Sequence, residues 1–153
     1  MTQEHIMKRR MIRSIILFII TFLALLVFIG LYIDETRRVQ ETYRTQFIAN
    51  LAQTSESIQS YLDNDADLDM RYRRIISDMS SADTFVFLLD NVTEAQKITV
   101  NELQSALLRY PEQMRERERM EALLEAVTDL QSNLDKGFDE AAAIVDSLDL
   151  KGH

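Results

Sequence analysis

The sequence predicts an all-α protein, in which a single N-terminal transmembrane helix continues into an extracytoplasmic antiparallel bundle of three to five helices. Three observations lead to this prediction. Residues 14–33 form an uncharged, apolar stretch. After it, apolar residues recur at spacings of three and four, which is the period of an amphipathic helix. Only 3 Gly and 1 Pro occur in 153 residues, too few turn residues for a many-stranded sheet.

The apolar stretch Ser14–Ile33 has the length of a membrane span. Twenty residues rise about 30 Å as a helix, which matches the hydrocarbon core of a bilayer. The stretch exceeds a typical signal-peptide core, and no small-residue cleavage site follows it, so we expect an uncleaved anchor in the lipid bilayer. Basic residues are denser before it than after it: Lys8, Arg9, Arg10 and Arg13 precede it, and Arg37, Arg38 and Arg44 follow. The positive-inside rule then places the N-terminus in the cytoplasm.

The chain is thus expected to be a single-pass protein of the cell membrane with three parts. These are a short basic cytoplasmic tail (1–13), the transmembrane helix (14–33) and an acidic helical extracytoplasmic domain (34–153). Residues 1–33 carry a net charge of +3 and the whole chain −8, which leaves −11 on the domain. Such a domain repels nucleic acid and anionic lipid headgroups, so we exclude nucleic-acid binding. The absence of Cys excludes disulfides and, for an extracytoplasmic domain, favours a bacterial envelope protein.

The first helix of the domain is predicted over residues 34–62, continuous with the anchor. No Gly or Pro interrupts it, and an apolar face recurs at helical spacing, comprising Val39, Tyr43, Phe47, Leu51, Ile58 and Tyr61. Alternating Asp residues between Asp63 and Asp69 end this helix. They do not fit a calcium loop, because Leu68 and Arg74 stand where the loop needs Gly and Glu. We interpret them as a turn whose last acids cap the next helix.

A second helix is predicted over residues 67–89. It has the most regular seam in the chain: Leu68, Tyr72, Ile75, Met79, Ala82, Val86 and Leu89. The helix ends in five consecutive apolar residues, Phe85–Leu89, which a helix would bury on more than one side. A short buried strand is the alternative, but the chain offers no second strand to pair with it.

A break is predicted at Asp90–Thr93. A continuous helix from Asp67 to Tyr110 would be about 65 Å long and would drive acidic residues into the bilayer. Asn91 or Thr93 is therefore expected to cap a third helix over 93–109, with Glu94 or Gln96 completing a capping box. Because the apolar register continues through Val100, Leu103, Leu107 and Tyr110, a long kinked helix stays open as an alternative.

Two further helices are predicted, over 111–136 and 139–149. Pro111 suits the first position of the former, and Asp139 is expected to cap the latter. Gly137 dents or ends the helix before it. The charged run Arg115–Arg119 is expected to be an exposed, ion-paired turn. The apolar stripe of this part comprises Met120, Leu124, Val127, Leu130, Leu134, Phe138, Ala141, Val145 and Leu148.

No enzyme, cofactor or metal site is predicted. The only histidines are His5, in the basic tail, and His153, at the last position, so neither can serve a site in the domain core. No Gly-rich phosphate loop occurs. The acids are numerous, but no pair is marked as convergent, and none of the usual groups of a catalytic site is present.

The function we expect is that of a membrane-anchored interaction or adaptor module that binds another envelope or membrane protein. By helix rise, Phe85–Leu89 returns to within about 10 Å of the membrane surface. There Phe85, Phe87 and Leu88 either contact the transmembrane helices of a partner or close the bundle, and the closed bundle is the simpler interpretation. Heptad seams also suit a homo-oligomer, so a protein partner or a second copy is expected.

The alternative is a sensory input domain. Long antiparallel helices that rise from a membrane helix resemble, in architecture, the ligand-binding bundles of chemoreceptors and sensor kinases. With a predicted cytoplasmic tail of only 13 residues, such a sensor would signal through a partner. A stabilising small ligand would favour this alternative, and a stoichiometric protein partner would favour the adaptor.

Overall fold

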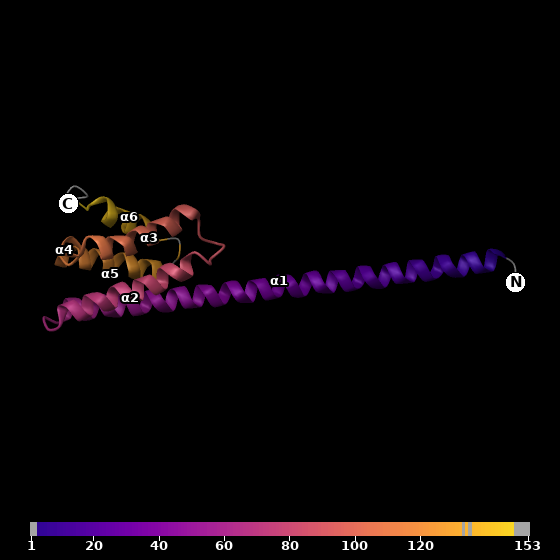
Figure 1. Cartoon of the computed structure of the whole chain (residues 1–153), viewed down its shortest axis with the longest axis horizontal. Coiled ribbons are helices and arrows are strands. Elements are labelled where there is room, and N and C mark those ends of the chain that lie inside the picture. The colour runs from indigo at the N-terminus through magenta and orange to yellow at the C-terminus, as the bar shows by residue number, and fades with distance from the viewer. Residues whose placement is uncertain (1–2, 133, 135, 149–153) are drawn as a thin grey trace. The chain divides into compact units, whose positions relative to one another are not determined.

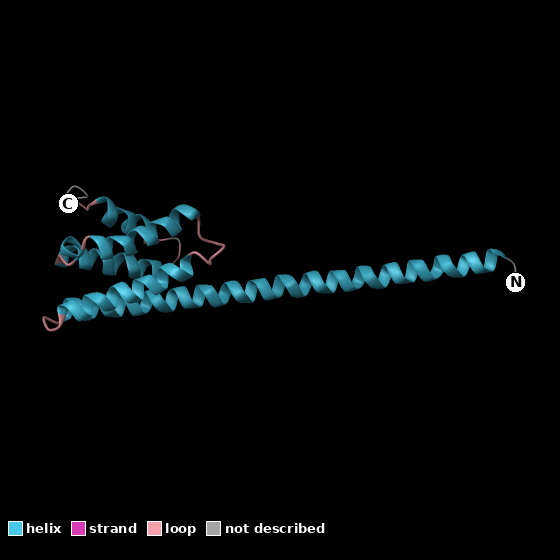
Figure 2. Cartoon of the chain, viewed as in Figure 1, coloured by secondary structure: helices cyan, strands magenta, loops and turns pink. Residues whose placement is uncertain are grey.

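The computed structural model describes residues 3–132, 134 and 136–148, apart from the side chains of residues 3–6. Within these residues it contains six helices and no strand, as Figures 1 and 2 show, which confirms the all-α prediction. The strand alternative for Phe85–Leu89 is therefore wrong. The chain forms two compact units, Met1–Val39 and Gln40–His153.

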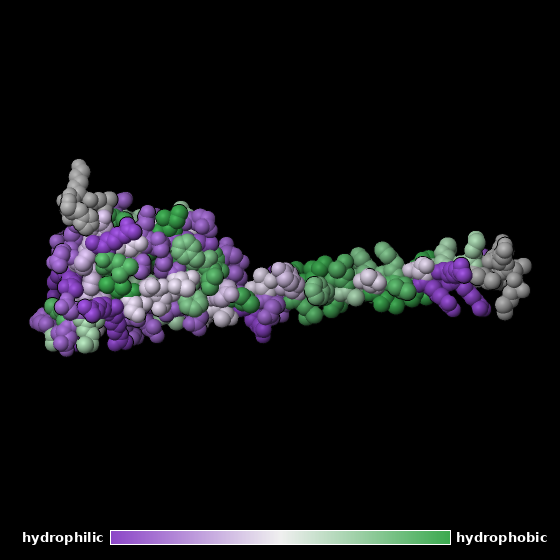
Figure 3. Space-filling view, viewed as in Figure 1, coloured by the Kyte–Doolittle hydropathy of each residue, from purple (hydrophilic) through white to green (hydrophobic). Residues whose placement is uncertain are grey.

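The first unit consists of the N-terminal part of α1 (Gln3–Asp63). This part contains an 18-residue window with a mean hydropathy of 3.0, none of which is buried, and Figure 3 shows hydrophobic residues gathered along it. Phe18 and Phe28 are 71% and 67% exposed. The Thr21 hydroxyl donates a hydrogen bond to the carbonyl of Leu17 (2.9 Å), so this polar group is satisfied within the helix. The helix is thus long and apolar enough to span a membrane.

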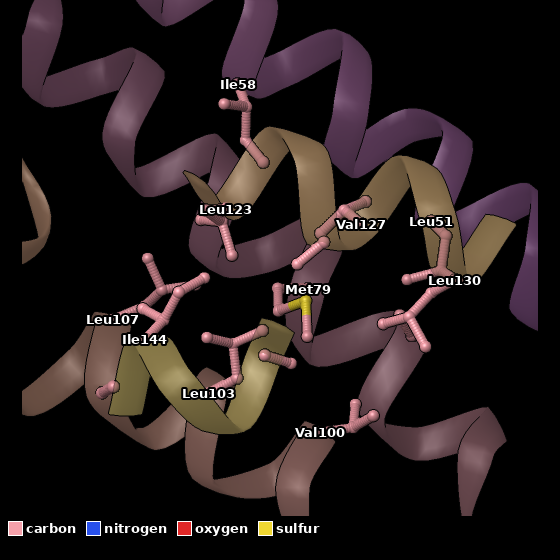
Figure 4. Packing of buried hydrophobic residues seen from close by; sticks show 14 of the residues in the cluster. Leu51, Ile58, Met79, Val100, Leu103, Leu107, Leu123, Val127, Leu130 and Ile144 are labelled. Carbon is pink, nitrogen blue, oxygen red and sulfur yellow. The ribbon is translucent and has the colours of Figure 1, made fainter. Parts of the chain in front are cut away.

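The second unit is built from the C-terminal part of α1 and from five further helices. These are α2 (Leu68–Val86), α3 (Glu94–Arg109), α4 (Pro111–Met114), α5 (Arg117–Ser132) and α6 (Phe138–Asp146). All six helices contribute to one hydrophobic core. Figure 4 shows part of it, where Met79 of α2 lies between Val127 of α5 and Leu103 of α3, and Leu51 of α1 lies beside Leu130 of α5. The unit is therefore held by apolar burial that joins segments far apart in sequence.

Polar contacts tie α2 to α1 in reverse order along the two helices. Near the end of α1 the Tyr61 and Tyr72 rings lie 6.2 Å apart. One turn earlier the Ser57 hydroxyl donates to Asp78 Oδ2 at 2.6 Å. Tyr72 also connects α2 to α3, because its hydroxyl donates to the carbonyl of Leu107 at 2.8 Å. These contacts fix the register of the three helices.

The break before α3 is present, and it has the predicted cap. The Thr93 side chain accepts a hydrogen bond from the Gln96 backbone N–H (3.3 Å), and the Thr93 N–H donates to Gln96 Oε1 (2.9 Å). This is the expected capping box, with Thr93 rather than Asn91 as the cap. The alternative of one long kinked helix is therefore wrong.

The helix predicted over 111–136 is interrupted at Arg115 and Glu116, between α4 and α5. Arg115 is not simply a solvated residue, because its guanidinium lies 4.7 Å from the centre of the Tyr72 ring and pairs with Asp69 (2.8 Å). The Tyr61 hydroxyl donates to the Arg115 carbonyl at 3.4 Å. These contacts therefore join the break to α1 and α2. Both ion pairs predicted for the same run are present, Arg119–Glu116 at 3.6 Å and Arg117–Glu121 at 2.8 Å. The second pair is exposed as predicted, whereas Arg119 of the first is half-buried.

Two predicted caps are wrong. Asp67 precedes α2 in a left-handed conformation (φ 56°) and makes no side-chain cap hydrogen bond. Asp139 lies in the first turn of α6, whose N-cap is Gly137 at φ 88°. A Cβ on Gly137 would lie 2.6 Å from the Ala126 carbonyl oxygen, so the close approach of the chain to α5 requires glycine here.

Seven of the nine residues of the predicted stripe are buried, namely Met120, Val127, Leu130, Leu134, Phe138, Ala141 and Leu148. Leu124 and Val145 are only half-buried, and Leu123, Ala126 and Ile144 are buried in addition. Some predicted positions lie outside the described residues. These are Asn133 and Asp135 of the helix predicted over 111–136, Asp149 of the helix predicted over 139–149, and His153.

Candidate interaction surface

The turn between α2 and α3 is one of the places in the second unit where large apolar side chains reach the surface, as Leu68, Met70, Ile98 and Leu108 also do. α2 ends at Val86, and two tight hydrogen bonds follow, from the Leu88 N–H to the Phe85 carbonyl (3.1 Å) and from the Leu89 N–H to the Val86 carbonyl (3.2 Å). Val86, Leu89 and Val92 are buried. Every third residue of the turn is thus buried in the core.

Phe87 and Leu88, between these buried residues, are exposed by 45% and 44%. Phe85 is half-buried and packs against the core. The helix predicted to continue to Leu89 therefore ends earlier, and Phe87 and Leu88 are not buried as the further turn of such a helix would be. The reason is that the chain turns here with a spacing of three residues instead of burying every side of a helix. Of the three predicted contact residues, Phe87 and Leu88 are thus accessible and Phe85 is half-buried.

Gln40 of α1 holds this turn through a contact that sequence reasoning did not find. Its Nε2 donates to the Leu88 carbonyl at 3.2 Å, and its Oε1 accepts from the Asp90 N–H at 3.1 Å. The side-chain amide therefore bonds one donor and one acceptor of the turn at once. The residues are about fifty positions apart, and one Gln among several carries no signal of such a contact.

The outward side of α2 carries no charge in its last three turns. The exposed residues from position 77 to position 88 are all polar-neutral or apolar: Ser77, Ser80, Ser81, Thr84, Phe87 and Leu88. We call these six residues the outer α2 face. The next exposed residue is the acid Asp90, in the turn. The Ser81 hydroxyl donates to the Ser77 carbonyl (3.1 Å) and that of Thr84 to the Ser80 carbonyl (3.0 Å), so two of its hydroxyls are satisfied within the helix. These two hydroxyls therefore need no hydrogen-bond acceptor from water or from a partner.

The two acids of this part of α2 turn away from the outer face. Asp78 accepts the hydrogen bond of Ser57, and Asp83 accepts one from Asn101 Nδ2 at 3.0 Å. The other oxygen of Asp83, Oδ1, is buried and has no hydrogen-bond partner. Burial raises the pKa of Asp83 above its ordinary value, against the opposing effect of the Asn101 hydrogen bond. The carboxylate is therefore in an unfavourable site between α2 and α3.

A polar cluster lies at the other end of α2. Burial raises the pKa of Tyr72 to about 12, although the nearby Arg115 guanidinium opposes the shift. A surface hollow beside Arg115 is lined mainly by three acids and two bases, namely Asp65, Asp67, Asp69, Arg73 and Arg115. Among the residues that the structure describes, no three His, Cys, Asp or Glu side chains are grouped so that they could hold a metal ion.

The chain matches none of the protein-family models, curated proteins or solved structures with which it was compared.

Proposed function

We propose that this protein is a membrane-anchored interaction module, without catalytic activity or cofactor, that binds another envelope or membrane protein. In this proposal residues 14–33 cross the bilayer, the N-terminus is cytoplasmic, and residues 34–153 form an extracytoplasmic antiparallel helical bundle. The partner binds at the outer α2 face, with Phe85, Phe87 and Leu88 at its membrane-side end. The observation that carries the proposal is this uncharged face on an acidic unit.

The membrane part of the proposal is supported by the composition and exposure of α1. Its apolar window is unburied, and large apolar side chains exposed to water are unfavourable unless lipid or protein covers them. The basic residues before the window and the single long helix favour an uncleaved anchor with a cytoplasmic N-terminus.

The protein-binding part is supported by the contrast between the outer α2 face and the rest of the unit. Residues 34–153 carry a net charge of −11, whereas none of the six residues of the face is charged. Depletion of charge and the presence of an aromatic residue are typical of the centre of protein interfaces. Thr84 lies in the middle of the face, so a partner helix would pack across it.

The experiment is copurification from crosslinked native membranes. Thr84→Arg places a long charged side chain on the face, and Thr128→Arg is its matched control. Thr128 is an exposed Thr on α5 whose hydroxyl also bonds the carbonyl four residues earlier, that of Leu124 at 2.7 Å. We expect a stoichiometric protein to copurify with the unaltered chain and with Thr128→Arg, and to be lost with Thr84→Arg. Equal recovery with both variants would contradict the proposal, as would the absence of any partner.

A second candidate function, sensory input, is favoured by the hollow beside Arg115. Arg73 and Arg115 line it, and Arg115 Nε is buried without a hydrogen-bond partner. A small anion could bond both guanidinium groups, although three Asp residues oppose it. A thermal-shift screen with small carboxylates and phosphate tests this function: a ligand that raises Tm for the unaltered chain and not for Arg73→Ala would favour it.

A further inference from the structure

We infer that the α2–α3 turn is a second membrane-contact site, at which Phe87 and Leu88 enter the surface of the bilayer that holds the apolar segment of α1. The inference rests on the membrane anchoring proposed above. It goes beyond that proposal because the contact is with lipid and is expected for the chain alone, before any partner binds.

The protein core does not cover the Phe87 and Leu88 side chains completely. Val86, Leu89 and Val92 fill the core positions of the turn, at 0%, 1% and 5% exposure. Phe87 and Leu88 alternate with these anchors and project where α2 has already ended. A rotation of the turn that buried Phe87 and Leu88 would expose Val86, Leu89 and Val92. The turn therefore keeps its apolar pair at the surface.

The length of chain between Ile33 and Gln40 limits how far this pair can lie from the bilayer surface. Gln40 bonds the backbone of the turn at Leu88 and Asp90. Gln40 follows Ile33, the last residue of the apolar segment, by seven positions. Seven residues cover about 10 Å as a helix and at most about 25 Å when fully extended. The turn is therefore within reach of the bilayer surface.

The size of the patch favours lipid over protein as its first contact. Two residues, each less than half exposed, are far from the roughly 800 Å² that each partner buries in a stable protein interface. Phe and Leu are, however, the residue types with which amphipathic segments enter the boundary between headgroups and acyl chains. The contact is apolar, and the net charge of −11 on residues 34–153 predicts that zwitterionic lipid suits it better than anionic lipid.

The test uses the full chain in phosphatidylcholine vesicles. Because the sequence has no Cys, Phe87→Cys and Leu88→Cys each give one labelling site for an environment-sensitive dye. Leu108→Cys is the matched control, since Leu108 is an apolar residue with 53% exposure, next to the Leu107 that bonds Tyr72 at the other end of α2. We expect a blue shift of the emission and its quenching by spin-labelled lipid at positions 87 and 88, and neither effect at 108.

Quenching at 87 and 88 no stronger than at 108 would overturn the inference. So would quenching that appears only in anionic vesicles, because that contact would be electrostatic. The purified chain carries no partner in this experiment. A negative result together with copurification of a partner from native membranes would therefore reject the lipid contact and leave the interaction module standing.

Discussion

The side-chain amide of Gln40 holds the backbone of Leu88. Its Nε2 donates to the Leu88 carbonyl at 3.2 Å while its Oε1 accepts from the N–H of Asp90, so one side chain of α1 fixes the turn that presents Phe87 and Leu88. Both groups that it bonds belong to a turn outside any helix, where no regular backbone partner is available. The exposed apolar pair is therefore held in a defined position rather than on a free loop.

Gln40→Ala removes both hydrogen bonds of this contact. We expect a loss of about 1 kcal/mol in the free energy of unfolding, since a typical intramolecular hydrogen bond contributes about 0.5–1.5 kcal/mol and these are solvent-accessible. Amide exchange at Asp90 should become faster. Gln46→Ala, at an exposed Gln of the same helix, is the control. Equal exchange at Asp90 in the two variants would show that Gln40 does not hold the turn.

Gly137→Ala should destabilise the second unit by more than about 1 kcal/mol, because the residue adopts φ 88° and a Cβ would lie 2.6 Å from the Ala126 carbonyl oxygen. Gly30→Ala is the internal comparison, since a Cβ there meets nothing within 4 Å and Ala favours a helix. Thermal unfolding in detergent micelles measures both. A lower Tm for Gly30→Ala than for Gly137→Ala would contradict the close packing of α6 on α5.

Thr93→Ala removes the side-chain half of the capping box and should cost about 1 kcal/mol of stability. Thr99→Ala, in the interior of the same helix, removes a methyl group and a hydroxyl that is bonded to the Ala95 carbonyl, and leaves the cap intact. That change should stay within about 0.5 kcal/mol, because Ala is the better helix former. Urea unfolding distinguishes the two, and equal effects would mean that the cap does not stabilise the start of α3.

Asp83→Asn should change how stability depends on pH. The raised pKa means that the folded state binds the Asp83 proton more tightly than the unfolded state. The resulting stabilisation is fully present below the ordinary pKa of 3.8 and is lost as pH rises through the higher pKa of the folded state. Asn at this position cannot ionise, so the variant does not lose stability in this way as pH rises. Its stability relative to the unaltered chain should therefore increase as pH rises above 3.8.

Urea unfolding of both proteins over a pH series measures this difference. Glu102→Gln, which removes an exposed carboxylate from α3, corrects for the change in net charge. A difference between Asp83→Asn and the unaltered chain that stays constant with pH would show that burial of Asp83 does not influence its ionisation.

Local sequence patterns predicted the features that depend on near neighbours. The predicted seam is buried at each position from Tyr72 to Leu89, because the four-three spacing keeps one face of a helix turned to the core. Its first predicted residue, Leu68, is 40% exposed. The Thr93 capping box and the first position of Pro111 in α4 depend only on residues within one turn. Such features can be predicted because the residues that determine them are close together in the sequence.

The features that the sequence did not reveal depend on contacts between distant segments. At the break, Arg115 contacts Tyr61, Asp69 and Tyr72, which come from other helices. Leu123 and Leu124 are adjacent and equally apolar, so only packing against other helices decides which of them enters the core. The exposure of Phe87 and Leu88 follows from where α2 ends, and the contact with Gln40 joins residues 48 positions apart.

The central claim is that the outer α2 face binds a protein in the membrane. The most direct measurement places a photocrosslinking residue at Ser81, in the middle of that face, or at Thr128, which is equally exposed on α5. Native membranes are irradiated and extracted with detergent, and the products are identified by mass spectrometry. We predict one dominant protein adduct at position 81, either a membrane protein or a second copy of this chain, and none at position 128. The absence of a specific adduct at 81, or the same adducts at both positions, would contradict the claim.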